Sequence, residues 1–227
     1  MTKRTLVMAC LALLASVAAP RAEKSSDEAR RISDATEVFQ EIMGAEDKAI
    51  PKSILGRAEA IAVFPGTKKG AFGVGGTRGR GIISLRGKDG AWSSPAFLTL
   101  TGVSFGLQIG GQETDLVLVI NNRKGVETLV KNQFKLGADA SVAAGPVGRD
   151  AQAGTDLQMR AEILSYSRAR GVFAGVSING STIRQDRDAH ERFYGKPYLS
   201  RQILFDHAGG APAPVPAWQA ALRKFAK

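Results

Sequence analysis

Cysteine and histidine are scarce in this sequence, which has one cysteine and two histidines in 227 residues. Cys10 stands ahead of most of an apolar N-terminal run, whereas a lipoprotein signal places its modified cysteine after the run. If the N-terminal segment is removed, the remaining chain has neither disulfide nor thiolate chemistry. With only two histidines and no second cluster of metal-ligating residue types, the sequence also offers little for a zinc centre.

Long apolar runs are also missing. The longest, at 6–19, has about 14 residues, and a helix that spans a bilayer needs about 20. Lys3 and Arg4 precede this run and small residues end it, which is the pattern of an export signal. We therefore expect residues 1–22 to be a signal peptide. The mature protein should be exported to the periplasm of a bacterium and associate with the membrane peripherally.

Negative charge is in short supply, because 21 acidic residues face 31 basic ones and the formal net charge is +10. Removing Lys3, Arg4 and Arg21 with the signal leaves 28 basic residues against 21, a net charge of +7. Outside the cytoplasm such a charge suits an anionic lipid surface or an envelope polymer. We expect no nucleic-acid binding, since the KNQFK segment at 131–135 has only two basic residues and one aromatic residue, too few to indicate it.

Glycine, by contrast, is abundant, with 26 residues, or about 11% against an average near 7%. From Ile61 onward, short β-prone segments such as IAVF, GAFGVGGTR and GIISLR are separated by Gly, Pro or polar pairs. Their density and short turns favour antiparallel pairing, and glycine within strands permits bulges and strong coiling. We predict an α+β fold in which a strongly curved, glycine-rich, mainly antiparallel, barrel-like sheet is wrapped by several helices.

Helices are expected in four places before the C-terminal tail. The longest covers 23–43, ends at Gly44, and repeats apolar residues at three- and four-residue spacing, namely Ile32, Ala35, Phe39 and Ile42. A short helix begins at Pro51, a third runs from the Asn121–Asn122 pair to about Lys131, and a polar helix covers 186–194.

We expect one domain over 23–208 and a separate tail over 209–227. The tail begins with a proline-rich linker, which is semi-rigid. Its last ten residues place Trp218, Leu222 and Phe225 on one helical face, with basic residues elsewhere. Such a tip could touch a membrane or pack back on the domain, and the second arrangement is slightly favoured.

The sequence contains a serine-hydrolase motif, but the residues around it do not suit a catalytic serine. GVSFG, at 102–106, matches G-x-S-x-G with Ser104 as the nucleophile, and Asp115 and His190 follow in the required order. The motif needs a strand-to-helix turn, however, and the next residues, LQIGG, resemble a continuing strand. A serine esterase is kept as an alternative, but we predict no enzymatic activity and no cofactor.

Two charged clusters could hold a ligand. The glycine-rich GVGGTRGRG segment lacks the spacing of nucleotide-binding loops, but it brings Arg78 and Arg80 near Lys68 and Lys69. Guanidinium groups and exposed backbone N–H groups both suit phosphate, although a solvated basic turn explains the same residues. The second cluster is DRDAHER, which contains acidic residues at a predicted helix start, where the helix dipole already explains them. A metal site there is an alternative that we do not favour, with Asp186, Asp188, His190 and Glu191 as ligands.

Four stretches carry a resemblance to a known family. They are AIAVFPGTKKGAFGVGGTRGRG, WSSPAFLTLTGVSFGLQIGGQETDLVLVI, FKLGADASVAAGPVGR and EILSYSRARGVFAGVSINGSTIRQDRDAHERFYG, and together they cover about 45–198. The sequence resembles the SYLF domain family of lipid-binding proteins, which includes the actin-binding domain of yeast cortical-patch proteins. In that family GVSFG looks structural rather than catalytic.

The resemblance implies binding rather than catalysis, through basic residues and an amphipathic helix at the start of the domain. Carried over to this chain, it points to Lys48, Lys52 and Arg57, with Lys68 and Lys69 after them. Actin is not expected as a partner, because an exported chain would not meet it. We therefore predict a non-enzymatic envelope protein that binds anionic phospholipid, and the main alternative is an interaction protein for another protein or polymer. Tighter membrane binding would need apolar insertion, for which the candidates are Phe64, Phe72 and Trp218.

Overall fold

A single curved sheet forms the centre of the computed structural model, which describes residues 19–45, 49–72, 74–105, 112–131, 133–148, 160–169, 172–176 and 178–226. The strands are β1 (Ala60–Phe72), β2 (Val74–Leu85), β3 (Ala96–Phe105), β4 (Gln112–Ile120), β5 (Gln133–Lys135), β6 (Val142–Ala144), β7 (Ile163–Ala169), β8 (Val172–Gly175) and β9 (Thr182–Gln185). The helices are α2 (Ala19–Gly44), α3 (Lys52–Leu55), α4 (Arg123–Leu129), α6 (Arg187–Tyr194), α7 (Ser200–Phe205) and α8 (Val215–Phe225).

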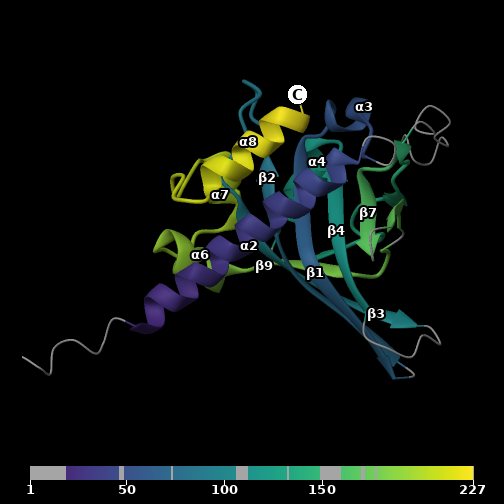
Figure 1. Ribbon diagram of the computed structural model, residues 1–227, viewed down its shortest axis with the longest axis horizontal. Coiled ribbons are helices and arrows are strands. Elements are labelled where there is room, and N and C mark those ends of the chain that lie inside the picture. Colours follow the sequence, from purple (N-terminus) through teal and green to yellow (C-terminus); the bar gives the residue numbers. More distant parts are fainter. Residues whose placement is uncertain are drawn as a thin grey trace, which may run out of the picture.

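The sheet confirms the predicted α+β class and the predominance of antiparallel pairing. Its nine strands follow the order β5-β9-β3-β2-β1-β4-β7-β6, with β8 paired to β7. The β6–β7 pair is parallel, the one exception among the described pairs of strands. Figure 1 shows a strongly curled sheet with α2, α6 and α8 against it. In the described part of the chain, none of the helices is long and apolar enough to cross a bilayer.

The two longest strands differ from the segments expected from the sequence. IAVF and GAFGVGGTR were expected to be separate strands, but β1 continues through Pro65 and Gly66, and its register with β2 shifts between Val63 and Lys68. The irregularity absorbs the proline, whose missing N–H a regular ladder would need. The GAFGVGGTR segment is instead divided between the end of β1 and the start of β2.

Both faces of the sheet are covered, which explains why the central strands alternate between two sets of buried residues. In β1, Ile61 and Val63 join one hydrophobic cluster, whereas Ala62 and Phe64 join the other. This is the two-residue period of a strand. α2 and α8 cover the first face and α4 and α7 the second.

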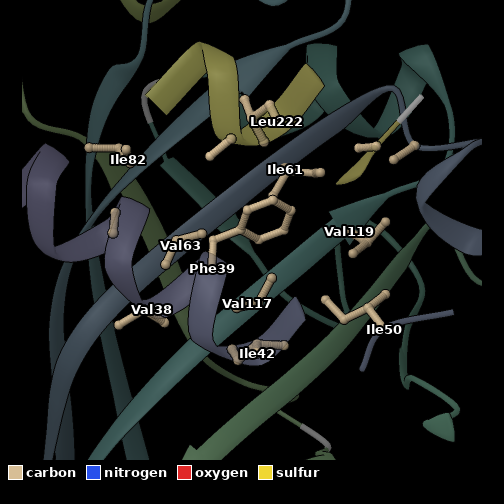
Figure 2. Packing of buried hydrophobic residues seen from close by; sticks show 14 of the residues in the cluster. Val38, Phe39, Ile42, Ile50, Ile61, Val63, Ile82, Val117, Val119 and Leu222 are labelled. Carbon is tan, nitrogen blue, oxygen red and sulfur yellow. The ribbon is translucent and has the colours of Figure 1, made fainter. Parts of the chain in front are cut away.

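Helix α2 supplies the centre of the first cluster. Phe39 projects from α2 with its ring toward Ile61 of β1 (Figure 2) and is fully buried. All four apolar positions predicted for this helix are buried. The 3.6-residue period therefore identified the packing face correctly.

The C-terminal helix α8 packs on the domain, the arrangement slightly favoured from the sequence. Trp218 is fully buried, donates a hydrogen bond from Nε1 to Ser84 Oγ at 2.9 Å, and meets Phe39 edge-on with ring centroids 5.7 Å apart. Arg86 donates from Nη2 to the carbonyl oxygens of Leu55 and Ala226, at 2.8 and 2.7 Å. The last helix is thus joined to both the sheet and α3.

Candidate functional site

The long β1–β2 pair forms an arm that extends beyond the helices (Figure 1). Lys68 on β1 lies directly opposite Arg78 on β2, and both side chains are exposed. Cross-strand partners point to the same face of a sheet, so the two cations lie side by side. Neither has an ion-pair partner among the described residues. We call Lys68 and Arg78 the basic arm.

Glycines allow the arm to pack closely. A Cβ atom at Gly81 would lie 2.4 Å from both the Phe64 ring and the Val63 carbonyl oxygen, and one at Gly79 would lie 2.6 Å from Thr67 Oγ1. Such distances are not tolerated between real atoms, so glycine at these positions lets large β1 side chains cross over β2. The glycine-rich composition therefore serves strand packing here.

The structure divides the basic residues that the sequence grouped together. Lys52 and Arg57 are exposed at the opposite end of the sheet, in and just after α3, which precedes the start of β1. Lys69 belongs to β1, but its side chain is not among those described, and Lys48 lies outside the described residues. Lys68 and Arg78 are brought together, and Lys52 and Arg57 are not part of the same surface.

Two of the three residues proposed for membrane insertion are in the core. Phe64 and Trp218 are both 0% exposed, so insertion of either side chain is incompatible with this conformation. Phe64 faces the second hydrophobic cluster, and Trp218 fills the space between α2 and the sheet. The apolar side chains of Phe64 and Trp218 therefore stabilise the fold. The side chain of Phe72 lies outside the described set.

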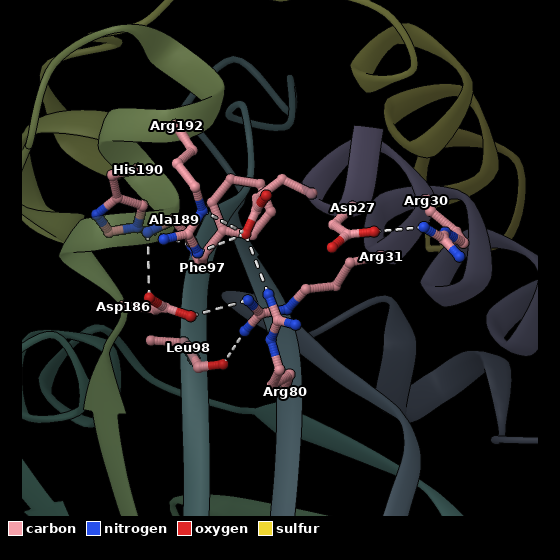
Figure 3. A network of polar contacts seen from close by, with 11 residues as sticks. Asp27, Arg30, Arg31, Arg80, Phe97, Leu98, Asp186, Ala189, His190 and Arg192 are labelled. Atoms are coloured by element: carbon pink, nitrogen blue, oxygen red, sulfur yellow. Dashed lines mark hydrogen bonds and ion pairs between the residues drawn. The ribbon is translucent and has the colours of Figure 1, made fainter. Parts of the chain in front are cut away.

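Arg80 has a different role from the basic arm, because it contacts a buried carboxylate on α2. Glu28 is fully buried, and its Oε1 accepts hydrogen bonds from Arg80 Nη2 at 3.1 Å and from Arg192 Nη2 at 2.7 Å (Figure 3). Its Oε2 has no partner. Glu28 thus joins α2, β2 and α6, a connection that nothing in the local sequence pattern indicates.

A second buried ion pair lies beside Glu28. Arg31 of α2 is 6% exposed and donates from Nη1 to Asp186 Oδ2 at 3.0 Å, and it also donates to the Leu98 carbonyl oxygen. Burial lowers the pKa of Arg31 to about 10, and Asp186 partly offsets that effect. Burial alone would raise the pKa of Asp186, but Arg31 outweighs it, so this pKa lies below its ordinary value. Arg31 therefore remains charged at neutral pH.

Asp186 and His190 of the DRDAHER cluster are committed to structural contacts. Asp186 caps α6 by accepting from the Ala189 N–H at 3.1 Å. His190 is fully buried, its Nε2 accepts from the Phe97 N–H at 2.8 Å, and its Nδ1 lies 2.7 Å from the Tyr198 carbonyl oxygen. These contacts assign the neutral tautomer with the proton on Nδ1. Burial lowers the pKa of His190 to about 4.

The remaining two members of that cluster are exposed on α6. Asp188 lies in the first turn, and Glu191 follows on the same helix. Across the described residues, no group of three or more His, Cys, Asp or Glu side chains could hold a metal ion.

The proposed esterase residues are not arranged as a catalytic triad. Ser104 belongs to β3 and pairs with Gly75 of β2, and its side chain is not described. Asp115 accepts hydrogen bonds from Arg168 and from the Gly66 N–H, while both ring nitrogens of His190 face backbone groups. The acid and base required by the motif are thus engaged elsewhere.

An acidic cleft adjoins the basic arm on the same face of the sheet. Its volume is about 640 Å³, and it lies between α2, β1, β4 and β7. The carboxylates that line it are those of Asp34, Glu37, Glu41, Glu113 and Asp115. Arg168 neutralises part of this charge through ion pairs with Glu41 and Asp115. Lys68 lies opposite Glu113 in the β1–β4 register, so the exposed face changes sign between β4 and β2.

These features define a class of protein: an α+β domain with a curled sheet that carries a charged, exposed face, and with buried charges that connect the N-terminal helix to the sheet and to α6. Comparison with known proteins is consistent with this class. Residues 101–226 match a family model described as "Ysc84: Las17-binding protein actin regulator".

Several proteins of yeast and mammals are similar to most of the chain. Protein YSC84 of Saccharomyces cerevisiae is 36% identical over 179 residues, which are 78% of this chain and 38% of the yeast protein. LAS seventeen-binding protein 3 of the same species is 35% identical over 182 residues, 79% of this chain and 39% of that protein. The human SH3 domain-containing YSC84-like protein 1 is 33% identical over 193 residues, 84% of this chain and 55% of that protein.

The chain therefore belongs to the Ysc84 (SYLF) family, which confirms the resemblance identified from the sequence. It spans between about two fifths and just over half of the length of these relatives. The name of LAS seventeen-binding protein 3 describes binding, and the family description adds actin regulation.

Proposed function

We propose that this chain is a non-enzymatic lipid-binding protein of the bacterial envelope, which contacts anionic phospholipid head groups through the basic arm. The observation that supports the proposal is the pairing of Lys68 with Arg78 on an exposed sheet face, where neither cation forms an ion pair with a described residue, although Glu113 lies opposite Lys68 on β4. Residues 1–22, with their signal-like pattern, would direct the protein out of the cytoplasm.

The strength of such binding can be estimated. A Lys or Arg near an anionic membrane contributes about 1 kcal/mol, so the basic arm supplies about 2 kcal/mol, or about 30-fold in affinity. The acidic cleft beside it is repelled by the same surface, which limits the orientations in which the protein can approach. The binding should be weak and sensitive to salt, because the Debye length falls from about 10 Å at 0.1 M to about 3 Å at 1 M.

Vesicle co-sedimentation tests the proposal. The protein from Glu23 onward is pelleted with neutral phosphatidylcholine vesicles, and with vesicles that also contain phosphatidylglycerol, at low and high salt. We expect binding to the anionic vesicles alone, weakened by salt and lost in the Lys68→Glu, Arg78→Glu double variant.

The matched control is the Arg187→Glu, Lys196→Glu double variant, which makes the same change in net charge at exposed residues of α6 and the segment after it. Arg80 is left unchanged because its reversal would place two carboxylates together at Glu28. Equal loss in both double variants would show that only net charge matters. Undiminished binding of the Lys68, Arg78 variant would refute the basic arm as the site.

A protein partner is the second candidate, favoured by the change of sign across the exposed face and by the names of the relatives. A partner with complementary charges could contact the basic arm and the acidic cleft together. Co-sedimentation with actin filaments tests one such partner, because the family description names actin as what its members regulate. Pelleting with filaments, together with no binding to any vesicle, would favour this candidate over lipid binding.

A further inference from the structure

A smaller cavity lies at the opposite end of the sheet from Lys68 and Arg78. Its volume is about 220 Å³, and it lies between α3, the β4–α4 connection and the start of β7. Arg57 and Arg160 contribute charged side chains to its lining, and Asn121 and Asn122 contribute amides. No carboxylate is among the lining residues that the structure describes. The cavity is therefore the cationic counterpart of the acidic cleft.

The polar groups in this cavity have unused hydrogen-bonding capacity. Arg57 Nε donates to the Ser53 carbonyl oxygen at 3.2 Å, and its terminal nitrogens have no partner in the described part of the chain. Arg160 likewise has no ion-pair partner among the described residues. Asn122 Oδ1 accepts from the Gly125 N–H at 2.7 Å, which leaves its NH₂ group available as a donor. Asn121 is held by a hydrogen bond from Nδ2 to the Ala161 carbonyl oxygen at 3.2 Å. Two guanidinium groups and an amide thus line one cavity.

The rest of the lining is apolar. Ile54 is 5% exposed and Leu164 is 3% exposed, and both belong to the hydrophobic core, as does Ala161. A bare inorganic ion would leave this floor without contacts. A volume of 220 Å³ equals that of about seven waters at roughly 30 Å³ each, which is enough for an oxyanion carried by a body of a few carbon atoms.

We propose that this cavity binds a small organic oxyanion, a phosphate ester or a carboxylate, held by Arg57 and Arg160 with its carbon body against Ile54 and Leu164. Guanidinium forks match the geometry of both oxyanions. The inference goes beyond the proposed function, because the cavity is distant along β1 and β2 from the basic arm. A free metabolite and a lipid head group can both carry such an oxyanion, and the experiment below distinguishes these two sources.

Amide chemical shifts of the purified ¹⁵N-labelled protein test the proposal. The probes are inorganic phosphate, glycerol 3-phosphate and butyrate, each titrated to millimolar concentration. We expect saturable shifts at Asn121, Asn122 and Ala161, with glycerol 3-phosphate or butyrate tighter than phosphate. Arg57→Gln and Arg160→Gln should each weaken binding by about tenfold or more, since each removes a charge-assisted hydrogen bond. Arg187→Gln, an exposed arginine of α6, is the matched control.

Two further measurements make the result decisive. Arg57→Gln removes a hydrogen bond to the Ser53 carbonyl oxygen, so this substitution could also lower the stability of the fold. The melting temperatures of Arg57→Gln and Arg160→Gln are therefore measured. If Arg57→Gln is unstable, the test relies on Arg160→Gln alone. Anionic vesicles are also added to the Lys68→Glu, Arg78→Glu variant. Shifts of the same amides would show that the cavity binds a lipid head group as well. The proposal is overturned if no probe causes saturable shifts there, or if the Arg160→Gln variant binds the probes with the affinity of the wild type.

Discussion

Truncating Trp218 should be among the most damaging single changes in the C-terminal helix. Trp→Ala substitutions in cores cost about 3–5 kcal/mol. The upper part of that range applies here, because the ring is fully buried, pairs edge-on with Phe39, and donates to Ser84. The substitution also leaves the buried Ser84 hydroxyl without its donor. We expect a loss of about 4–5 kcal/mol, against a total of about 5–15 kcal/mol for a typical domain.

Urea unfolding followed by circular dichroism measures this loss. At about 2–4 °C per kcal/mol for a chain of this size, the melting temperature should fall by about 8–20 °C. Arg223→Ala, at an exposed position of the same helix, should stay within about 0.5 kcal/mol of the wild type. A loss below about 1 kcal/mol for Trp218→Ala would refute the packing of α8 on the domain, and would reopen a membrane role for this residue.

Three other perturbations test the buried network and the strand packing. Glu28→Ala should cost about 2–3 kcal/mol in urea unfolding, less than the 3–5 kcal/mol of a fully buried pair, because Arg80 and Arg192 can turn toward water. The folded protein holds His190 neutral down to about pH 4, whereas the unfolded chain binds this proton near pH 6.5, so the unfolding free energy should fall by about 3 kcal/mol between about pH 6.5 and pH 4. Gly81→Ala should cost about 1–3 kcal/mol by overpacking against Phe64.

Each of these has a result that would contradict it. A Glu28→Ala variant as stable as the wild type would mean that α2 is not held by this carboxylate. His190→Asn should flatten the pH dependence between pH 6.5 and pH 4, and an unchanged slope would assign it to other groups. Asp186 acts in a different range: its lowered pKa contributes stability above about pH 4, which is lost as the pH falls through its folded-state pKa. A stable Gly81→Ala variant would show that β1 and β2 can separate there.

The local pattern predicted helices well because their signals are carried by neighbouring residues. The 3.6-residue period in α2 identified its buried face, Asn122 caps α4 as expected, and Asp186 caps α6. Strand continuity was predicted less well. Proline and glycine ordinarily end a strand, but in β1 the register shift absorbs them. Whether a chain bulges or turns at such a point depends on the neighbouring strand, which the local sequence does not specify.

The sequence by itself determined the family, the α+β class, the helical faces and the presence of a basic segment. The tertiary structure decided how the charges are used, because it depends on partners distant in the chain. Arg80 and Arg78 are two residues apart on one strand, yet Arg80 contacts Glu28 while Arg78 lies opposite Lys68. Folding likewise placed Phe64 and Trp218 in the core and brought Arg160 to the same cavity as Arg57. Contacts between α2 and β2, or between β7 and α3, carry no periodic signal, so only the folded chain reveals them.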